Sequence, residues 1–518
     1  MNWKELTSSG LLAGIFVLAF GGQPHVRGAE ANAAPQVNVI LWFDTEDYLL
    51  PADDDASKRL AELLTERGIK ATFKIVGEKA RVLEQRDRRD VIAALQKHDI
   101  GYHANFHSVH PTPSEYLAEC GLLDGVAEFV RREGGGAADV RRIFAVPTLS
   151  CYGQPGSSWG AQTIVGLKQI GVAPHGVPCY VDEGTHVGLE GKPFWYAGGL
   201  VVYDMKANWT RMELHNPAAV VPGKEKVTAI AERLRNEGGG LISIFYHPCE
   251  WVHREFWDGV NFRRGANPPR LKMKPPPQST PEETEAAFQR FAEYIDHIRA
   301  LPNVRFVTAS DLPMLYPDVS RTQGASEEDL QEIVHRIQRN RTTGVDYQVI
   351  GRRAYSVADQ FELLTIAVTE LNAGRKPQWP LRLKGLLGPD GPPPSSTNEA
   401  ALVLDRFAFR DAALDGRRFL ETHGRVPARV FVGAQPVPPT VFLVAQAEAY
   451  EYHQSHGEFA LGLEIKPTAN VELLPARHVA KDTPDLFGGW VIHPAGFRAP
   501  KILEVARLQA WTLKPALR

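Results

Sequence analysis

The sequence predicts an α/β fold, namely a distorted (β/α) barrel of seven or eight units followed by a second, mainly helical C-terminal region. Three observations predict the barrel. Strand-like and helix-like segments alternate from residue 36 to about residue 310, several strand-like runs are almost continuously apolar, and reactive side chains follow these runs directly. Continuous apolar runs are typical of parallel strands that are covered on both faces. A doubly wound open sheet would show the same alternation and is the alternative.

The predicted strands are short and separated by amphipathic segments. They are Gln36–Phe43, Lys70–Val76, Ile100–Asn105, Arg142–Val146, Val177–Asp182, Leu200–Tyr203, Leu241–Tyr246 and Val304–Thr308. Apolar residues at helical spacing predict helices between most of them, for example at Pro281–Ala300. In either fold the chemistry lies at the carboxyl ends of the strands, so polar residues directly after a strand are candidate site residues.

The length of the chain indicates more than one domain. Its 518 residues exceed one ordinary hydrophobic core, and we expect the barrel at residues 36–318 and an accessory region at residues 326–518. Hydrophobic residues make up 43% and charged residues 23%, as in ordinary soluble globular proteins. The formal net charge of −3 gives no electrostatic reason to expect nucleic acid or an anionic membrane as a partner.

Residues 1–33 have the pattern of a secretory signal peptide. Lys4 precedes a short apolar run, Leu11–Phe20, and Ala-x-Ala patterns follow at residues 29–33. The run is shorter than the roughly 20 residues of a comfortable membrane span, although an uncleaved N-terminal anchor is the alternative. We therefore expect an exported protein, periplasmic or extracellular, with no other membrane span.

Two groups of residues have the chemistry of a metal site. His103 and His107 lie four residues apart after a predicted strand, and two imidazoles at this spacing can bind one Zn²⁺ or a similar cation. Asp44, Glu46 and Asp47 follow the first strand, where a cation or a shared proton would relieve their mutual repulsion. Surface histidines and a solvated acidic turn are the simpler interpretations.

A third histidine completes a hydrolytic set. His247 ends the apolar run LISIFY, and a histidine there could protonate a leaving amine, although a histidine buried in the core is the alternative. One carboxylate and two histidines leave open positions on a metal, and a further carboxylate and a distant histidine supply a base and an acid. Such a set hydrolyses amides or esters.

The phrases around these residues resemble the NodB-homology polysaccharide deacetylases, also called carbohydrate esterase family four. The resemblance covers residues 36–315, in the order and spacing of that family. It rests on GIKATFKIVGEKA (Gly68–Ala80), DIGYHANFH (Asp99–His107), ISIFYHP (Ile242–Pro248) and VRFVTASDL (Val304–Leu312). It implies a distorted barrel and a hydrolase that removes acetyl groups from an N-acetylated polysaccharide or cell-wall glycan. It also implies a divalent metal, for which Zn²⁺ fits best.

The resemblance also implies residue roles. Asp44 would be the base that activates water, His247 the acid, and His103 and His107 metal ligands. Asp182 and Glu183 lie where the family often has a residue that tunes the base. The family usually has two adjacent aspartates after the first strand, whereas this chain has Asp-Thr-Glu-Asp. Either Glu46 or Asp47 could therefore be the third ligand. The Arg-Pro-aromatic motif of the family is not recognisable.

Sugar binding is predicted from aromatic residues, because Trp and Tyr rings stack on sugars. Tyr152, Trp159 and Trp251 are the predicted substrate-binding residues, and core packing is the alternative. Farther along, Arg417–Ala447 resembles pseudomurein-binding-type repeats, which would imply attachment to a cell-wall polymer; a purely structural extension is the alternative.

Two other functions fit the same residues. The chain could hydrolyse another carbon–nitrogen or ester bond on this scaffold, or it could be a glycan-binding protein with a degenerate catalytic barrel. Retention of His103, His107, His247 and a candidate base favours an enzyme.

Overall fold

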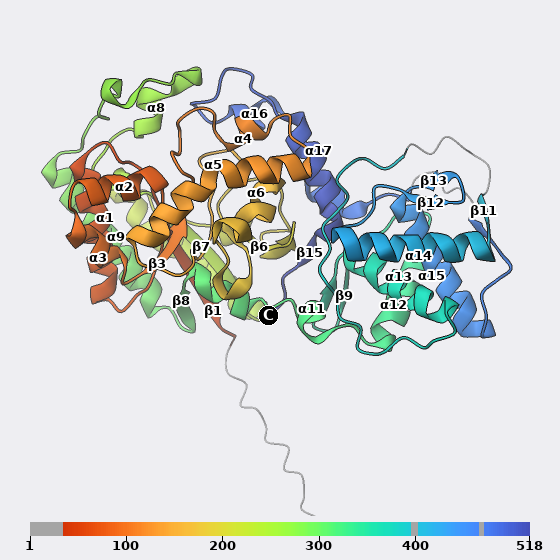
Figure 1. The fold of residues 1–518 in the computed structure, drawn as a ribbon. Helices are drawn as coiled ribbons and strands as arrows, with labels where there is room; N and C mark the ends of the chain where they lie inside the picture. The colour runs from red at the N-terminus through yellow and green to blue at the C-terminus, as the bar shows by residue number, and fades with distance from the viewer. Residues whose placement is uncertain (1–34, 395–401, 466–470) are drawn as a thin grey trace, which may run out of the picture. The chain divides into compact units, whose positions relative to one another are not determined.

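The computed structural model describes residues 35–394, 402–465 and 471–518 (Figure 1). The predicted signal peptide lies outside these residues. Among the helices of the described ranges, none has the length and apolar character that a membrane span requires.

Strand β1 (Val37–Thr45) is the centre of a parallel sheet, and all of its residues are buried. One edge of β1 pairs with β7 (Gly240–Tyr246). The other edge is shared, because β8 (Val304–Val307) pairs with the first half of β1 and β2 (Thr72–Ile75) with the second half. β3 (Asp99–Tyr102) pairs with β2. These strands are parallel throughout, as their apolar sequences predict.

The wall continues from β3 to β4 (Cys179–Val181) through single backbone bridges instead of a full strand. Tyr152 forms these bridges, to Tyr102 on one side and Tyr180 on the other. β4 then pairs in parallel with β6 (Gly199–Val202). This thin stretch of wall distorts the barrel.

The strand predicted at Arg142–Val146 is wrong. Arg142 and Ile143 are the last residues of helix α5 (Leu122–Ile143), and Phe144 is its buried C-cap. The apolar residues that suggested a strand instead pack the end of this helix against the core.

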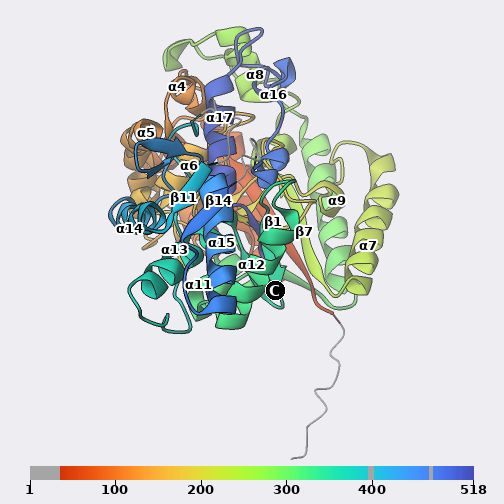
Figure 2. The ribbon, with the colours of Figure 1, turned by 90° about the vertical axis from the view of Figure 1, so that its right-hand side faces the viewer.

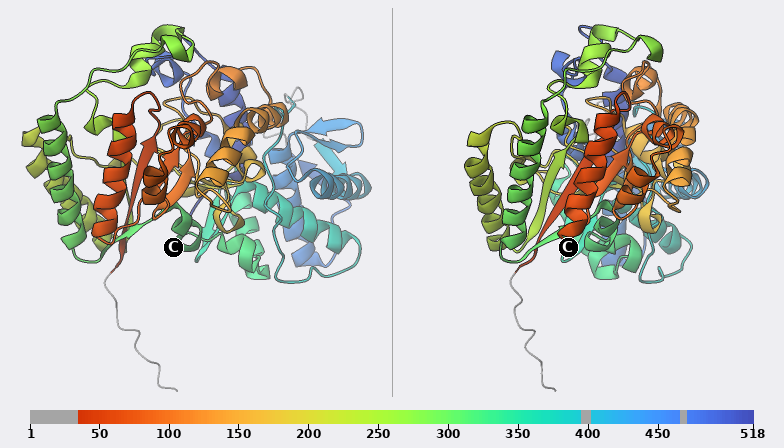
Figure 3. Two further views of the ribbon diagram at one scale, coloured as in Figure 1. Left: turned by 60° about the vertical axis from the view of Figure 1, so that its left-hand side comes forward. Right: turned by 90° about the vertical axis from the view of Figure 1, so that its left-hand side faces the viewer.

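Helices cover the outside of the strands (Figures 1 and 3). The last of them, α9 (Pro281–Ala300), has the predicted bounds, because Thr280 and Glu283 form a capping box at its start. It packs beside α7 (Val220–Asn236) (Figure 2). The remaining helices around the strands include α1 (Pro51–Glu66), α2 (Gly77–Gln85), α3 (Arg89–Leu95), α4 (Pro113–Leu117) and α6 (Ala161–Gly166).

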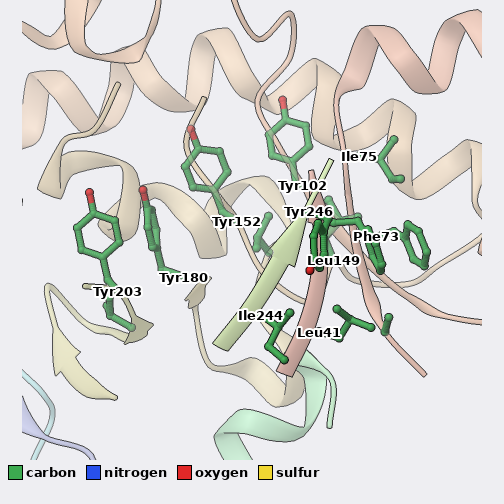
Figure 4. Packing of buried hydrophobic residues seen from close by; sticks show 14 of the residues in the cluster. Leu41, Phe73, Ile75, Tyr102, Leu149, Tyr152, Tyr180, Tyr203, Ile244 and Tyr246 are labelled. Carbon is green, nitrogen blue, oxygen red and sulfur yellow. The ribbon is translucent and has the colours of Figure 1, made fainter. Parts of the chain in front are cut away.

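The hydrophobic core of the barrel is rich in aromatic residues. Phe73 and Tyr102 lie in it with Tyr246 (Figure 4), and all three are fully buried. The phenol of Tyr102 donates hydrogen bonds to Glu133, and that of Tyr246 donates to the carbonyl of Met212. Burial of such large side chains stabilises the strands whose ends form the site.

A second hydrophobic core consists of residues between Ala325 and Val471, together with Trp511. As predicted, this region is mainly helical. Two units share one plan, in which a helix, a two-stranded hairpin and a second helix follow one another. The first consists of α12 (Glu327–Asn340), β9 (Gln348–Ile350), β10 (Arg353–Tyr355) and α13 (Val357–Asn372). The second consists of α14 (Arg406–His423), β12 (Val430–Val432), β13 (Gln435–Val437) and α15 (Pro439–His456). The similarity of Arg417–Ala447 to cell-wall-binding repeats stays a prediction.

The end of the chain returns to the barrel. Val479, Phe487 and helix α17 (Pro500–Gln509) pack in the first core, and α17 contacts α6. β15 (Lys514–Pro515) adds an antiparallel strand beside β5 (Phe194–Tyr196). Part of the predicted accessory region, residues 326–518, thus packs with the barrel. This return brings C-terminal residues close to the strand ends.

Candidate active site

A cavity of about 720 Å³ lies at the carboxyl ends of the parallel strands. Side chains that follow β1, β3, β4 and β7 line it together, as expected for a site in this fold. The cavity gathers the residues predicted for catalysis and metal binding, except Asp47: Asp44, Glu46, His103, His107, Asp182 and His247.

Glu46, His103 and His107 form a buried cluster that could hold a metal ion. One ligand atom of each lies within 4.8 Å of the others. The Glu46 Oε2 atom is 2.8 Å from His107 Nε2 and 3.5 Å from His103 Nε2. Two imidazole nitrogens and one carboxylate oxygen suit Zn²⁺ and related divalent ions, and leave further positions for water or substrate.

The other atoms of these ligands have partners that fix their orientation. His103 Nδ1 lies 3.1 Å from the carbonyl of Gly153, and His107 Nδ1 lies 2.6 Å from Ser108 Oγ. The indole of Trp257 donates to Glu46 Oε1 at 3.3 Å. Such partners select the tautomer that leaves Nε2 free, as in other protein metal sites.

The loop between the two histidines has an unusual backbone. Ala104 and His107 have φ values of +63° and +56°, in the left-handed region that side chains with a Cβ seldom adopt. The loop also lies against α5 at Gly136, where an added Cβ would be 2.5 Å from the Asn105 oxygen. Gly136 therefore allows this approach, although glycine weakens a helix.

Burial and the neighbouring charges act in opposite directions on the pKa values of the cluster. Burial raises the pKa of Glu46, but His107 and His103 outweigh it and hold that pKa well below its usual value. Burial lowers the pKa of His103, whereas the carboxylate of Glu46 overcomes burial and raises the pKa of His107. Glu46 is thus a carboxylate, the form that binds a cation.

The structure distinguishes between Glu46 and Asp47, the two candidates for the third metal ligand. Glu46 faces the histidines, whereas Asp47 points elsewhere. The Asp47 Oδ2 atom lies 3.0 Å from His253 Nδ1, and its Oδ1 accepts from the backbone of Leu49. Its carbonyl accepts from Lys79, a buried lysine. Glu46 is therefore the third member of the cluster, and Asp47 anchors the turn behind it.

Asp44 is held by a buried lysine. The Lys74 ammonium lies 2.8 Å from Asp44 Oδ1 and 3.4 Å from Asp182 Oδ2, and it donates to the carbonyl of Val181. Burial lowers the pKa of Lys74, but the two carboxylates outweigh it and raise that pKa. Lys74 therefore stays charged and links Asp44 to Asp182, the residue predicted to tune it.

His247 lies on the other side of Asp44. Its Nε2 is 3.7 Å from Asp44 Oδ2, and its Nδ1 is 2.7 Å from Glu250 Oε1. Arg211 pairs with the same glutamate. Burial lowers the pKa of His247, but Glu250, Glu46 and Asp44 together raise it to about 9. His247 is thus an imidazolium at neutral pH and can donate a proton.

Sequence reasoning missed Lys74 and Glu250. Lys74 lies within a strand whose four residues are all buried, and a lysine there requires a buried counter-charge. That pattern was a usable signal. Glu250 follows His247 by three residues and forms a capping box with it in a short helix, a weaker signal.

The three aromatic residues predicted to bind substrate lie outside the cavity. Tyr152, Trp159 and Trp251 are fully buried, and Figure 4 shows Tyr152 among other core tyrosines. Trp159 stacks on His186, and Trp251 packs edge-to-face against Phe291. The structure corrects this prediction in favour of core packing. The aromatic residues that do line the cavity are Trp209, Phe245, Phe256 and Trp490.

Comparisons with known proteins give structural similarity alone. No protein-family model and no curated protein matches the chain. Among solved structures, a candidate polysaccharide deacetylase from Mycobacterium smegmatis is 14% identical, with a TM-score of 0.34, over 54% of this chain and 90% of that one. Puue allantoinase is 11% identical, with a TM-score of 0.34, over 57% and 95%. A family 4 carbohydrate esterase from Streptomyces lividans is 13% identical, with a TM-score of 0.25, over 52% and 92%.

Proposed function

We propose that the protein is a metal-dependent hydrolase that removes acetyl groups from an N-acetylated polysaccharide. One observation carries the proposal, namely that the cluster of Glu46, His103 and His107 shares a cavity with Asp44 and His247. The motifs HANFH and ISIFYHP, which contain three of these residues, resemble those of polysaccharide deacetylases. The proposal thus rests on geometry and motif together, because fold alone does not define function.

The cluster would hold the metal. A divalent cation bound by Glu46, His103 and His107 would polarise the acetyl carbonyl and lower the pKa of a water molecule in the site. Zn²⁺ suits the two nitrogen atoms and one oxygen atom best, while Co²⁺, Ni²⁺ and Fe²⁺ have similar preferences.

Asp44 would accept the proton of the attacking water. Its carboxylate lies beside the cluster, with Oδ1 3.3 Å from His103 Nδ1. Lys74 pairs with Asp44 and fixes its position, and Asp182 pairs with the same ammonium. The base is therefore oriented before substrate arrives, which lowers the cost of reaching the transition state.

His247 would donate a proton to the nitrogen atom of the sugar amine as its bond to the acetyl carbon breaks. Glu250 accepts from Nδ1, so Nε2–H points toward Asp44 and the cavity. Base and acid thus lie on one wall, 3.7 Å apart at their nearest charged atoms. This arrangement is suited to taking a proton from water and giving one to a leaving amine in the same turnover.

The predicted signal peptide leads us to propose an exported enzyme that acts on a glycan outside the cytoplasm. Residues 326–471, the part of the accessory region that does not return to the barrel, would then serve attachment to a cell-wall or matrix polymer, or structural support. Both are proposals for the same chain and do not alter the chemistry of the cavity.

Acetate release from a panel of acetylated glycans tests the proposal. We expect the purified protein to release acetate, to lose this activity with a chelator, and to regain it with Zn²⁺. The double variant His103→Ala/His107→Ala should release none. Metal bound without acetate release from any glycan would indicate another amide or ester substrate, and absence of both would indicate a glycan-binding protein.

A further inference from the structure

The cavity has a wall that comes from the far C-terminal part of the chain. Trp490 and Val491 line it beside the residues that follow the barrel strands. They belong to the segment that returns to the barrel after the second core, near α16 (Pro484–Gly488) (Figure 1). This wall has no role in the hydrolytic chemistry described above.

The indole of Trp490 is fixed on three sides. Its Nε1 donates to Asp258 Oδ2 at 2.9 Å. Its ring stands edge-to-face against His107, with centroids 5.6 Å apart and planes at 86°. On a third side it packs on Gly156, where an added Cβ would lie 2.3 Å from the ring. The backbone φ of +48° at Gly156 also favours glycine, and the absence of a Cβ there lets the Trp490 ring approach the backbone.

The segment that carries Trp490 is held by backbone hydrogen bonds and by a buried side chain. The amides of Arg264 and Gly265 donate to the carbonyls of Val491 and Ile492, at 3.0 and 2.8 Å. The Ile492 side chain is fully buried in a small cluster with Tyr48, Trp257 and Phe262. A rigid wall loses little entropy when a ligand binds, so it can position a substrate.

A histidine fastens the same segment to the barrel. The Nε2 atom of His493 lies 3.2 Å from Thr112 Oγ1 and 3.3 Å from Ser114 Oγ, at the start of α4. Its Nδ1 lies 2.6 Å from the carbonyl of Phe487. The wall is therefore attached to the barrel by direct contacts, even though residues 326–471 lie between the two in the sequence.

From these contacts we propose that Trp490 is a substrate-binding residue that holds the sugar ring next to the metal cluster. This inference rests on the proposed function. The indole is only partly covered, and its free surface faces a cavity whose polar groups include Asp258, Arg263 and Gln154. A flat apolar surface beside hydrogen-bonding groups suits a pyranose, which has C–H faces and a rim of hydroxyl groups. The substrate class is thus an acetylated sugar whose ring lies on the indole, and not a small amide without a sugar ring.

The test compares an N-acetylated oligosaccharide with an alkyl acetate ester, which carries the acetyl group but no ring that could stack on the indole. We expect Trp490→Leu to raise KM for the oligosaccharide about tenfold with a smaller change in kcat, and to lower the oligosaccharide-to-ester ratio of kcat/KM. Trp490→Phe should recover part of the loss, because it keeps a flat ring. Trp379→Leu, which replaces another partly exposed tryptophan in the second region, should leave both substrates unaffected.

Metal content and thermal unfolding of each variant separate binding from structural support. Equal losses on both substrates, together with reduced metal content, would assign Trp490 to the support of His107 and overturn the inference. An unchanged KM for the oligosaccharide in Trp490→Leu would overturn it as well, while leaving the proposed function intact. Absence of oligosaccharide turnover by the wild-type protein would overturn both.

Discussion

The barrel and the second helical region bury charged groups for different purposes. In the barrel, buried Asp44 and Glu46 line one cavity, and buried Lys74 pairs with Asp44. In residues 325–471, the buried carboxylates Asp329 and Asp359 form capping boxes at the first turns of α12 and α13. The same residue types are buried in both regions, but their partners differ.

The difference shows how a functional site can be recognised from the hydrogen-bond partners of its buried carboxylates. Asp329 accepts from the backbone of Ser326 and from the phenol of Tyr355. Those bonds satisfy the carboxylate within the fold. Around the barrel cavity, one carboxylate oxygen of Glu46 instead faces two imidazoles, an arrangement that a cation would complete. Among the described residues, the cluster of Glu46, His103 and His107 is the one with metal-ligand geometry.

The largest expected effect tests Asp44 as the base. Asp44→Asn should lower kcat by about 10²–10⁴-fold, because an amide cannot accept the proton, while metal content stays near wild type. Steady-state kinetics and metal analysis measure both. Asp329→Asn is the matched control in the second region, and it should keep full activity. Comparable losses of activity in the two variants would break the comparison between the regions.

The second prediction concerns the lysine that links two carboxylates. Lys74→Met leaves Asp44 and Asp182 without their cation, so we expect a loss of about 3–5 kcal/mol in the free energy of unfolding. Activity should also fall, because Asp44 loses its fixed position. Denaturant unfolding and kinetics measure the two effects. A stable variant with full activity would show that Lys74 does not orient the base.

The third prediction is a shift in pH dependence. His247 acts as an acid only when protonated, so activity should be present below its pKa and lost as pH rises through about 9. Glu250→Gln removes the carboxylate that favours the imidazolium, so the alkaline limb of kcat/KM should move to lower pH by roughly one unit. An unmoved limb would exclude His247 as the titrating acid.

The smallest effect is expected in the second region. Ser356→Ala removes the hydroxyl that accepts from the amide of Asp359 at the start of α13, and should cost about 1 kcal/mol of stability. Metal content and acetate release should stay at wild-type levels. A change in either would mean that the second region contributes to the site.

Much of the fold was predictable, because it is set by local patterns. The apolar runs of β1 and β7 and the capping residues of α9 are visible in the sequence, and so is the spacing of His103 and His107. The choice between Glu46 and Asp47 was not predictable, since the turn after β1 decides which carboxylate faces the histidines. Trp490 reaches the cavity only because the chain returns after a second core, and no local pattern encodes that return.

Separate substitutions of Glu46 and Asp47 test the assignment of the metal site most directly. Zn²⁺ binding is to be measured by titration calorimetry and metal analysis in Glu46→Gln and Asp47→Asn, with folding of each checked by circular dichroism. We predict that the wild type and Asp47→Asn bind one Zn²⁺ per chain, and that Glu46→Gln, though folded, binds it far more weakly. Full Zn²⁺ affinity in folded Glu46→Gln would contradict the assignment of the metal site.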